Sequence, residues 1–148
     1  MAVDPAGTGP TGLLAVPEDI TRAGWWVGST RLGDRFGSIV LAAHVDSFTQ
    51  GVGPMAELLS VRPGDTVRVT GGRLRLRFRV GSVTSVPRVR LPERSRLFSP
   101  YGDLRLVLIT CGGPYEPERG YRDNVVVVAT PTGVRPDAGA LYGRRRPE

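Results

Sequence analysis

Two apolar runs constrain the fold of this chain more than any other feature of its sequence. They are LRLVLIT, at residues 104–110, and NVVVVAT, at residues 124–130, and both are rich in β-branched side chains. Such runs are typical of strands that are buried on both faces of a sheet or enclosed in a barrel. The stretch from Gly112 to Asp123 is polar, so we expect it to be a surface loop that joins two central strands.

Shorter segments with strand or turn character surround these runs. The pair Gly71-Gly72 can supply the positive φ angles of a tight hairpin turn between two of them. The segments are a strand over GLLAVPED (residues 12–19) ended by Pro17, an apolar strand at 38–43, a helical turn or two from Pro54, and hairpin strands at 65–70 and 73–80. This succession, with almost no helical periodicity, predicts a mainly β protein.

The length of the chain favours one domain. It has 148 residues with 20 Gly and 13 Pro, which implies many turns. A chain of about 150 residues buries roughly 68–70% of its unfolded surface, enough for a core without a metal or disulfide. We expect a flexible segment at 1–11, a β-domain at 12–134 and a basic tail at 135–148. No run reaches the length of a membrane span and the start lacks a leader pattern, so the chain as written is expected to be soluble.

The positive charge of the chain comes entirely from arginine. The 20 basic residues give a net charge of +6, and lysine is absent. Arginine alternates with apolar residues at Arg73, Arg75, Arg77 and Arg79, so one face of that strand is basic and the other apolar. This basic face fits a solvated outer surface or a surface that binds an anionic polymer, and the sequence leaves both open.

The single cysteine stands at the end of the first central run. Cys111 follows LIT and precedes Gly112-Gly113, and a lone Cys cannot form an internal disulfide. It fits a small apolar residue that finishes the strand, or a nucleophile that the strand holds in place while the glycines leave room for a substrate backbone. A reactive thiol needs a base or a positive neighbour.

The sequence offers both a possible base and a positively charged residue, each next to an apolar run. His44, the only histidine, ends SIVLAAH, and Arg122 begins the second central run. If both apolar strands enter the same end of a barrel, His44 and Cys111 can meet and form a thiolate–imidazolium pair. Antiparallel pairing of the central runs would return Arg122 to the thiol, where it could stabilise an oxyanion, although a surface pair with Asp123 is the simpler interpretation.

These motifs resemble those of the sortases, the cysteine transpeptidases of Gram-positive cell surfaces. The resemblance extends from GLLAVPED and GWW through GSIVLAAHVDS and MAELLSVRPGDTVRV to LITC and YRDNVVVVA, and is most like the actinobacterial class E and F sortases. It implies a single closed eight-stranded β-barrel with short helical turns. It also implies the catalytic residues His44, Cys111 and Arg122, with Thr110 helping to line the substrate groove.

The resemblance further implies the reaction and its partners. Cys111 would cleave an LPXTG-like sorting signal between Thr and Gly, and the thioacyl enzyme would pass the surface protein to an amine such as that of a lipid-linked peptidoglycan precursor. An anchored full-length form would work at the extracellular face of the membrane, through a segment absent from this chain. No cofactor, metal or nucleic acid is expected.

Two departures and two alternatives accompany this resemblance. Ala43 stands where the family usually has Gly, and residues 1–11 are too short to supply both the first strand and the anchor of the family. An inactive sortase-like binding module is one alternative. The other is a small basic β-barrel that binds nucleic acid, which would have no need for the Cys/His/Arg set.

Overall fold

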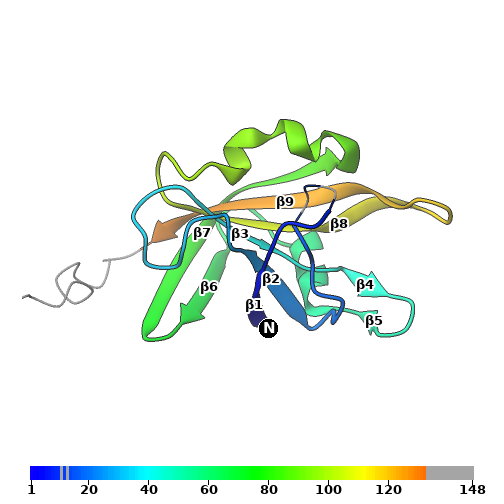
Figure 1. Cartoon of the computed structure of the whole chain (residues 1–148), viewed down its shortest axis with the longest axis horizontal. Coiled ribbons are helices and arrows are strands. Elements are labelled where there is room, and N and C mark those ends of the chain that lie inside the picture. Colours follow the sequence, from blue (N-terminus) through cyan, green and yellow to red (C-terminus); the bar gives the residue numbers. More distant parts are fainter. Residues whose placement is uncertain (11, 13, 133–148) are drawn as a thin grey trace, which may run out of the picture.

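Seven strands form one curled sheet, a half-barrel, in the computed structural model, which describes residues 1–10, 12 and 14–132 (Figure 1). Their order across the sheet is β1-β2-β3-β8-β9-β7-β6, and β4 pairs with β5 separately. The strands are β1 Ala2–Ala6, β2 Arg22–Trp26, β3 Ser38–Ala42, β4 Asp46–Ser47, β5 Gly51–Val52, β6 Thr66–Gly71, β7 Leu74–Pro87, β8 Arg105–Glu116 and β9 Gly120–Thr132.

The two apolar runs of the sequence lie at the centre of this sheet. They form β8 and β9, which pair antiparallel, while β3 runs parallel to β8 on its other side. Val107 and Val127 are fully buried there. The expectation of a mainly β fold of the sortase type is confirmed, although the main sheet has seven strands and curls without closing into an eight-stranded barrel.

Three short 3-10 helices cover the two faces of the sheet. They are η1 Pro54–Leu59, η2 Arg88–Glu93 and η3 Ser95–Phe98. On the face covered by η1, a core packs around Phe78, which is 0% exposed, and includes Met55 and Leu58 of η1. On the opposite face, Val126 and its buried neighbours pack beneath the segment that contains η2 and η3 (Figure 1).

Several local expectations are confirmed. The apolar run after residue 37 forms β3, and Pro54 begins η1. The hairpin turn between β6 and β7 contains Gly72, whose φ of +57° is the left-handed conformation that favours glycine. Arg75, Arg77 and Arg79 are exposed, whereas Phe78 and Val80 are buried. The alternation of arginine and apolar residues in the sequence predicted this pattern.

Three expectations need correction. Residues 112–123 form the end of a long β8–β9 hairpin, not a loop, because pairing resumes at Tyr115–Tyr121 after a bulge. Where a strand was predicted, the described residues 12 and 14–19 contribute only an isolated bridge between Leu14 and Thr8. The segment 1–11, expected to be flexible, contributes β1, which pairs in parallel with β2. The tail at 135–148 lies outside the described residues.

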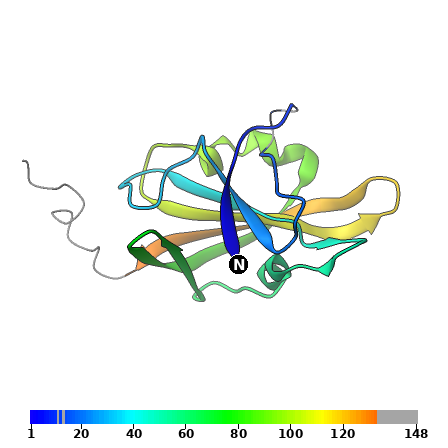
Figure 2. The same ribbon diagram turned by 60° about the horizontal axis from the view of Figure 1, so that its bottom comes forward.

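The two hairpins of the sheet project in opposite directions. In both views the β8–β9 hairpin and the β4–β5 pair lie at one end of the molecule, and the β6–β7 hairpin lies toward the other (Figures 1 and 2). β4 begins two residues after His44, and β8 contains Cys111, so both residues belong to segments that lead to this end of the molecule.

Candidate active site

Parallel pairing of β3 with β8 brings His44 and Cys111 to the same edge of the sheet. The last paired positions are Ala42 and Ile109, and a hydrogen bond of 3.2 Å from the Ala43 amide to the Ile109 carbonyl continues the contact. His44 and Cys111 each follow two residues after that pair. Because side chains alternate along a strand, Cys111 lies on the face of Ile109, and His44 follows the end of β3 at the matching position.

Thr110 fixes this alignment from the opposite face. Its side chain is 2% exposed, and its hydroxyl donates a hydrogen bond of 2.8 Å to the Ala43 carbonyl. Alternation turns its side chain away from the face of Cys111, and its part in lining the groove stays a prediction. Its contact joins the residue before the histidine to the residue before the cysteine.

The thiol of Cys111 is half-buried, and its surroundings raise its pKa. Burial raises its pKa, the positive charge of Arg88 opposes that rise, and the negative charge of Asp46 adds to it. A thiol with a raised pKa needs a base to become a nucleophile. The imidazole of His44 makes no hydrogen bond or ion pair with other described residues, so it remains available for proton transfer.

Arg122 lies one strand away from the thiol. Cys111 is paired with Asn124, so Arg122, two residues along β9, lies on the same face diagonally from Cys111. Its side chain is 59% exposed, and its Nε donates to the carboxylate of Asp123 at 3.2 Å. The surface pair with Asp123 is thus present, and it leaves the terminal Nη groups of the guanidinium without a partner among the described residues.

Arg88 is a second arginine at this site, and the sequence analysis missed it. It follows β7, whose last residue Pro87 is paired with Asp123, and its Nη2 donates to the Arg119 carbonyl at 3.1 Å. Its proximity to Cys111 depends on β7 and β8 both pairing with β9. No local pattern in the sequence predicts that arrangement.

A hydrogen bond joins the segment after His44 to the β8–β9 hairpin. The Tyr121 hydroxyl donates to the Asp46 carboxylate at 2.6 Å, and this bond raises the pKa of Tyr121 to about 12. Tyr121 also stacks edge-to-face on Tyr115 at 5.1 Å between ring centroids, and Tyr115 does so on Phe48 at 6.1 Å. The bond connects the two segments that carry the histidine and the cysteine.

An apolar groove opens beside these residues on the same face. Its volume is about 340 Å³, and its floor includes Ala42 and Ile109, the residues two positions before His44 and Cys111. Asn124, the partner of Cys111, also lines it, as does Arg88. The other lining residues are Gly12, Leu14, Val16, Trp26, Val40, Leu91, Pro92 and Phe98.

Trp26 contributes to the wall of this groove. It stacks edge-to-face on Phe98 at 6.0 Å between centroids and packs against the core beneath η2 and η3. Trp25 packs on the opposite core, and its indole donates to the Thr30 carbonyl at 3.1 Å. The two neighbouring tryptophans therefore pack against the two opposite cores of the sheet.

Two further observations concern ions and membranes. Over residues 1–10, 12 and 14–132, no group of three or more His, Cys, Asp or Glu side chains is arranged to hold a metal ion. In the same described ranges, none of the helices has the length and apolar character needed to cross a bilayer.

Comparisons with known proteins converge on one family. The family model described as Sortase domain matches residues 7–132. The fold is similar to sortase A from Corynebacterium diphtheriae, with a TM-score of 0.59 and 24% identity, over 80% of this chain and 52% of that chain. It is also similar to SrtA sortase from Actinomyces oris, with a TM-score of 0.61 and 20% identity, over 80% of this chain and 67% of that chain.

A sortase C from Streptococcus pneumoniae gives a similar result. Its TM-score is 0.59 at 19% identity, over 77% of this chain and 54% of that chain. The present chain thus spans about half the length of the Corynebacterium and Streptococcus structures. A comparison with curated proteins gives no significant match.

Proposed function

Because this chain belongs to the sortase family, we propose that it is a cysteine transpeptidase with Cys111 as nucleophile and His44 as general acid and base. The observation that supports the proposal is the register of β3 and β8, in which His44 and Cys111 each come two residues after the paired Ala42 and Ile109 that line an apolar groove. Sortases act on surface proteins and pilins. The substrate proposed here is an LPXTG-like sorting signal, cleaved between Thr and Gly.

The proposed reaction begins with proton transfer from the Cys111 thiol to His44. The thiolate attacks the Thr carbonyl carbon, and the C–N bond to Gly breaks as the imidazolium protonates the departing amine. A thioester then links Cys111 to the Thr carbonyl. An incoming amine gives a proton to His44 and attacks this thioester, and the C–S bond breaks to regenerate the thiol.

We assign the oxyanion of each tetrahedral intermediate to Arg122. The Asp123 pair holds its Nε, while its Nη groups keep N–H donors for the developing charge. The apolar groove would hold the residues before the scissile bond, since its floor leads along β8 to the nucleophile. A carboxylate-bound arginine is already oriented, so less side-chain freedom is lost when substrate binds.

From membership of the sortase family we also propose the acceptor of the reaction and its location. The acceptor is an amine, such as that of a lipid-linked peptidoglycan precursor, and the reaction takes place at the extracellular face of the membrane. Assignment to class E or F belongs to the proposal as well. A preference between LPXTG-like and LAXTG-like peptides is the measurement that begins to fix the class.

A mass-spectrometric assay tests this function. Wild type and Cys111→Ala are incubated with each peptide, with and without oligoglycine. We expect Thr-Gly cleavage and oligoglycine ligation by wild type only, with a thioacyl adduct on Cys111. Folded wild-type protein that gives neither cleavage nor adduct would overturn the proposal. Peptide binding without turnover would then favour an inactive binding module, and salt-sensitive oligonucleotide binding that survives Cys111→Ala would favour a nucleic-acid-binding barrel.

A further inference from the structure

The face of the sheet that carries the groove also carries, toward the β6–β7 hairpin, arginine and hydroxyl side chains at alternate positions of neighbouring strands. On β7 these are Arg75, Arg77 and Arg79, all exposed. The positions paired with them on the neighbouring strands are also basic or hydroxyl-bearing, and no acidic residue occurs among them. The paired residues are Thr70, Arg68 and Thr66 on β6, and Thr132 and Thr130 on β9 opposite Arg77 and Arg79. We call this set the arginine face.

Within the arginine face two like charges lie directly opposite each other. Arg68 is paired with Arg77 across β6 and β7, where paired Cβ atoms are about 5 Å apart. Like charges in this position oppose strand pairing unless an anion lies between them. None of the guanidinium groups at 68, 75, 77 and 79 makes a hydrogen bond or ion pair within residues 1–10, 12 and 14–132.

A bulge extends this face toward η2 and η3. The register shifts between Val80 and Ser82, so Ser82 and Thr84 pair with Val128 and Val126 and lie on the same face as Arg79. Ser82, Thr84, Val126 and Val128 border a cavity of about 370 Å³. Without the bulge, alternation would have turned the two hydroxyl side chains toward the opposite core.

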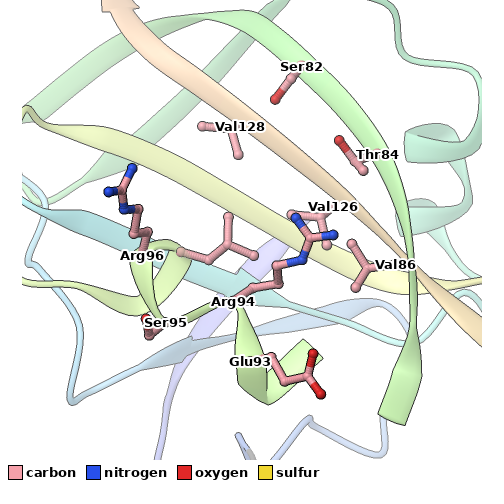
Figure 3. A pocket seen from close by; sticks show the side chains of 10 residues that line it. Ser82, Thr84, Val86, Glu93, Arg94, Ser95, Arg96, Val126 and Val128 are labelled. Atoms are coloured by element: carbon pink, nitrogen blue, oxygen red, sulfur yellow. The ribbon is translucent and has the colours of Figure 1, made fainter. Parts of the chain in front are cut away.

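Two arginines border the cavity on the side opposite the sheet. Arg94 and Arg96 come from the η2–η3 segment, and Figure 3 shows their side chains on the same side of the sheet as Ser82 and Thr84. Neither guanidinium has a partner among the described residues. The one carboxylate that lines the cavity, Glu93, accepts a hydrogen bond from Arg90 at 3.2 Å. The cavity therefore combines two free cations with the hydroxyl groups of Ser82, Thr84 and Ser95.

We propose that the arginine face and this cavity together bind a linear polymer of phosphate groups. Arginine and hydroxyl side chains are the groups that bind phosphate oxygens. Alternate residues of one strand recur about every 6.8 Å, so the guanidinium groups form a row that suits a repeating anion. The row begins at the β6–β7 hairpin and reaches the cavity beside η2 and η3.

The chemistry of the face favours phosphate over other anionic partners. Single-stranded nucleic acid is usually held by aromatic side chains that stack on its bases, and membrane surfaces by apolar side chains that insert. Among the described residues, the exposed large hydrophobic side chains all lie outside β6, β7 and β9. Charge and hydrogen bonding are therefore the interactions that this face offers.

Binding of fluorescent long-chain inorganic polyphosphate tests the proposal. The test variant is Arg68→Gln/Arg77→Gln/Arg79→Gln, and its matched control is Arg144→Gln/Arg145→Gln/Arg146→Gln, which removes the same charge from the tail. We expect about tenfold or greater loss of affinity in the test variant only. The slope of log K against log salt should fall by about 2 for three lost phosphate contacts. Polyphosphate should also raise the melting temperature of wild type more than that of the test variant.

Other results would overturn the proposal. They are equal loss of affinity in the test and control variants, equal competition by orthophosphate at matched phosphate concentration, or tighter binding to oligo-dT or to anionic vesicles than to polyphosphate. Arg94→Gln/Arg96→Gln provides a second variant, which should weaken polyphosphate binding without disturbing the sheet. The measurement is independent of peptide cleavage, so Cys111→Ala should bind polyphosphate as wild type does.

Discussion

At the scale of single residues, the reactivity of Cys111 depends on competing charges. Burial and Asp46 raise the pKa of the thiol, while Arg88 lowers it. A raised pKa means that thiolate appears only at higher pH, so the proposed reaction near neutral pH would need His44 to accept the proton. Asp46 has a second role, because it also accepts the hydrogen bond from Tyr121.

These opposing charges lead to a prediction about alkylation of Cys111. In wild type, the pH midpoint for reaction with iodoacetamide should lie above the ordinary cysteine value. Asp46→Asn removes a negative charge and should lower the midpoint, whereas Arg88→Gln removes a positive charge and should raise it. Arg31→Gln, a change outside the charges that act on the thiol, is the control. Shifts of the same sign in both site variants would contradict the assignment.

At the scale of elements, the candidate site lies where β3 ends beside the middle of β8, which is paired there with β9. Backbone register aligns the residues after Ala42 and Ile109, and the Thr110 hydroxyl holds the two strands at that point. Beyond the end of β3, the hydrogen bond between Tyr121 and Asp46 joins the β8–β9 hairpin to β4. The hairpin and β4 thus form one connected wall near the thiol.

Removing the hydrogen bond between Tyr121 and Asp46 should loosen the contact between the β8–β9 hairpin and β4 without unfolding the protein. Tyr121→Phe keeps the ring packed on Tyr115 but removes the hydroxyl, so peptide turnover should fall while the unfolding midpoint changes little. In wild type, spectroscopic titration should show Tyr121 ionising at about 12, and the hydrogen bond should be lost as pH rises through that value. Asp46→Asn should lower the Tyr121 pKa. Unchanged titration in Asp46→Asn would contradict the bond.

At the scale of the whole molecule, two cores on opposite faces of one sheet hold the fold. The core under η1 contains Phe78, which is fully buried, and the other lies beneath η2 and η3. Phe78 lies on the strand whose opposite side carries the arginine face, so β7 separates a hydrophobic core from a charged surface. Stability and polyanion binding therefore depend on alternate residues of the same strand.

Substitution of one buried and one exposed phenylalanine tests this arrangement. Phe78→Ala should lower the free energy of unfolding by about 3–5 kcal/mol, because it removes contacts and leaves a cavity in the core. Phe48→Ala is the matched control, since Phe48 is 95% exposed, and its cost should be within about 0.5 kcal/mol. Urea unfolding measures both. Similar losses in the two variants would show that Phe78 is not the centre of the core.

Local pattern in the sequence was enough to predict the central strands, the β6–β7 hairpin and the position of His44 just after β3. Cys111, expected at a strand end, lies within β8 instead. Apolar runs, period-two alternation and glycine turns act over a few residues, so they can be recognised without the fold. The same reasoning missed the strand character of residues 112–123, because polar residues in an exposed hairpin resemble a loop. It also assigned Thr110 to the groove, which stays a prediction, while alternation from Cys111 turns its side chain to the opposite face.

The sequence by itself determined that this is a mainly β protein whose lone thiol, lone histidine and Arg122 border its apolar strands. Only the tertiary structure decided which of these residues face one another and which charges act on the thiol. Arg88 and Asp46 reach Cys111 through strands that are distant in the chain, and Arg122 is bound to Asp123. The physical reason is that register and sheet order arise from long-range pairing and burial, whereas strand character is written in neighbouring residues.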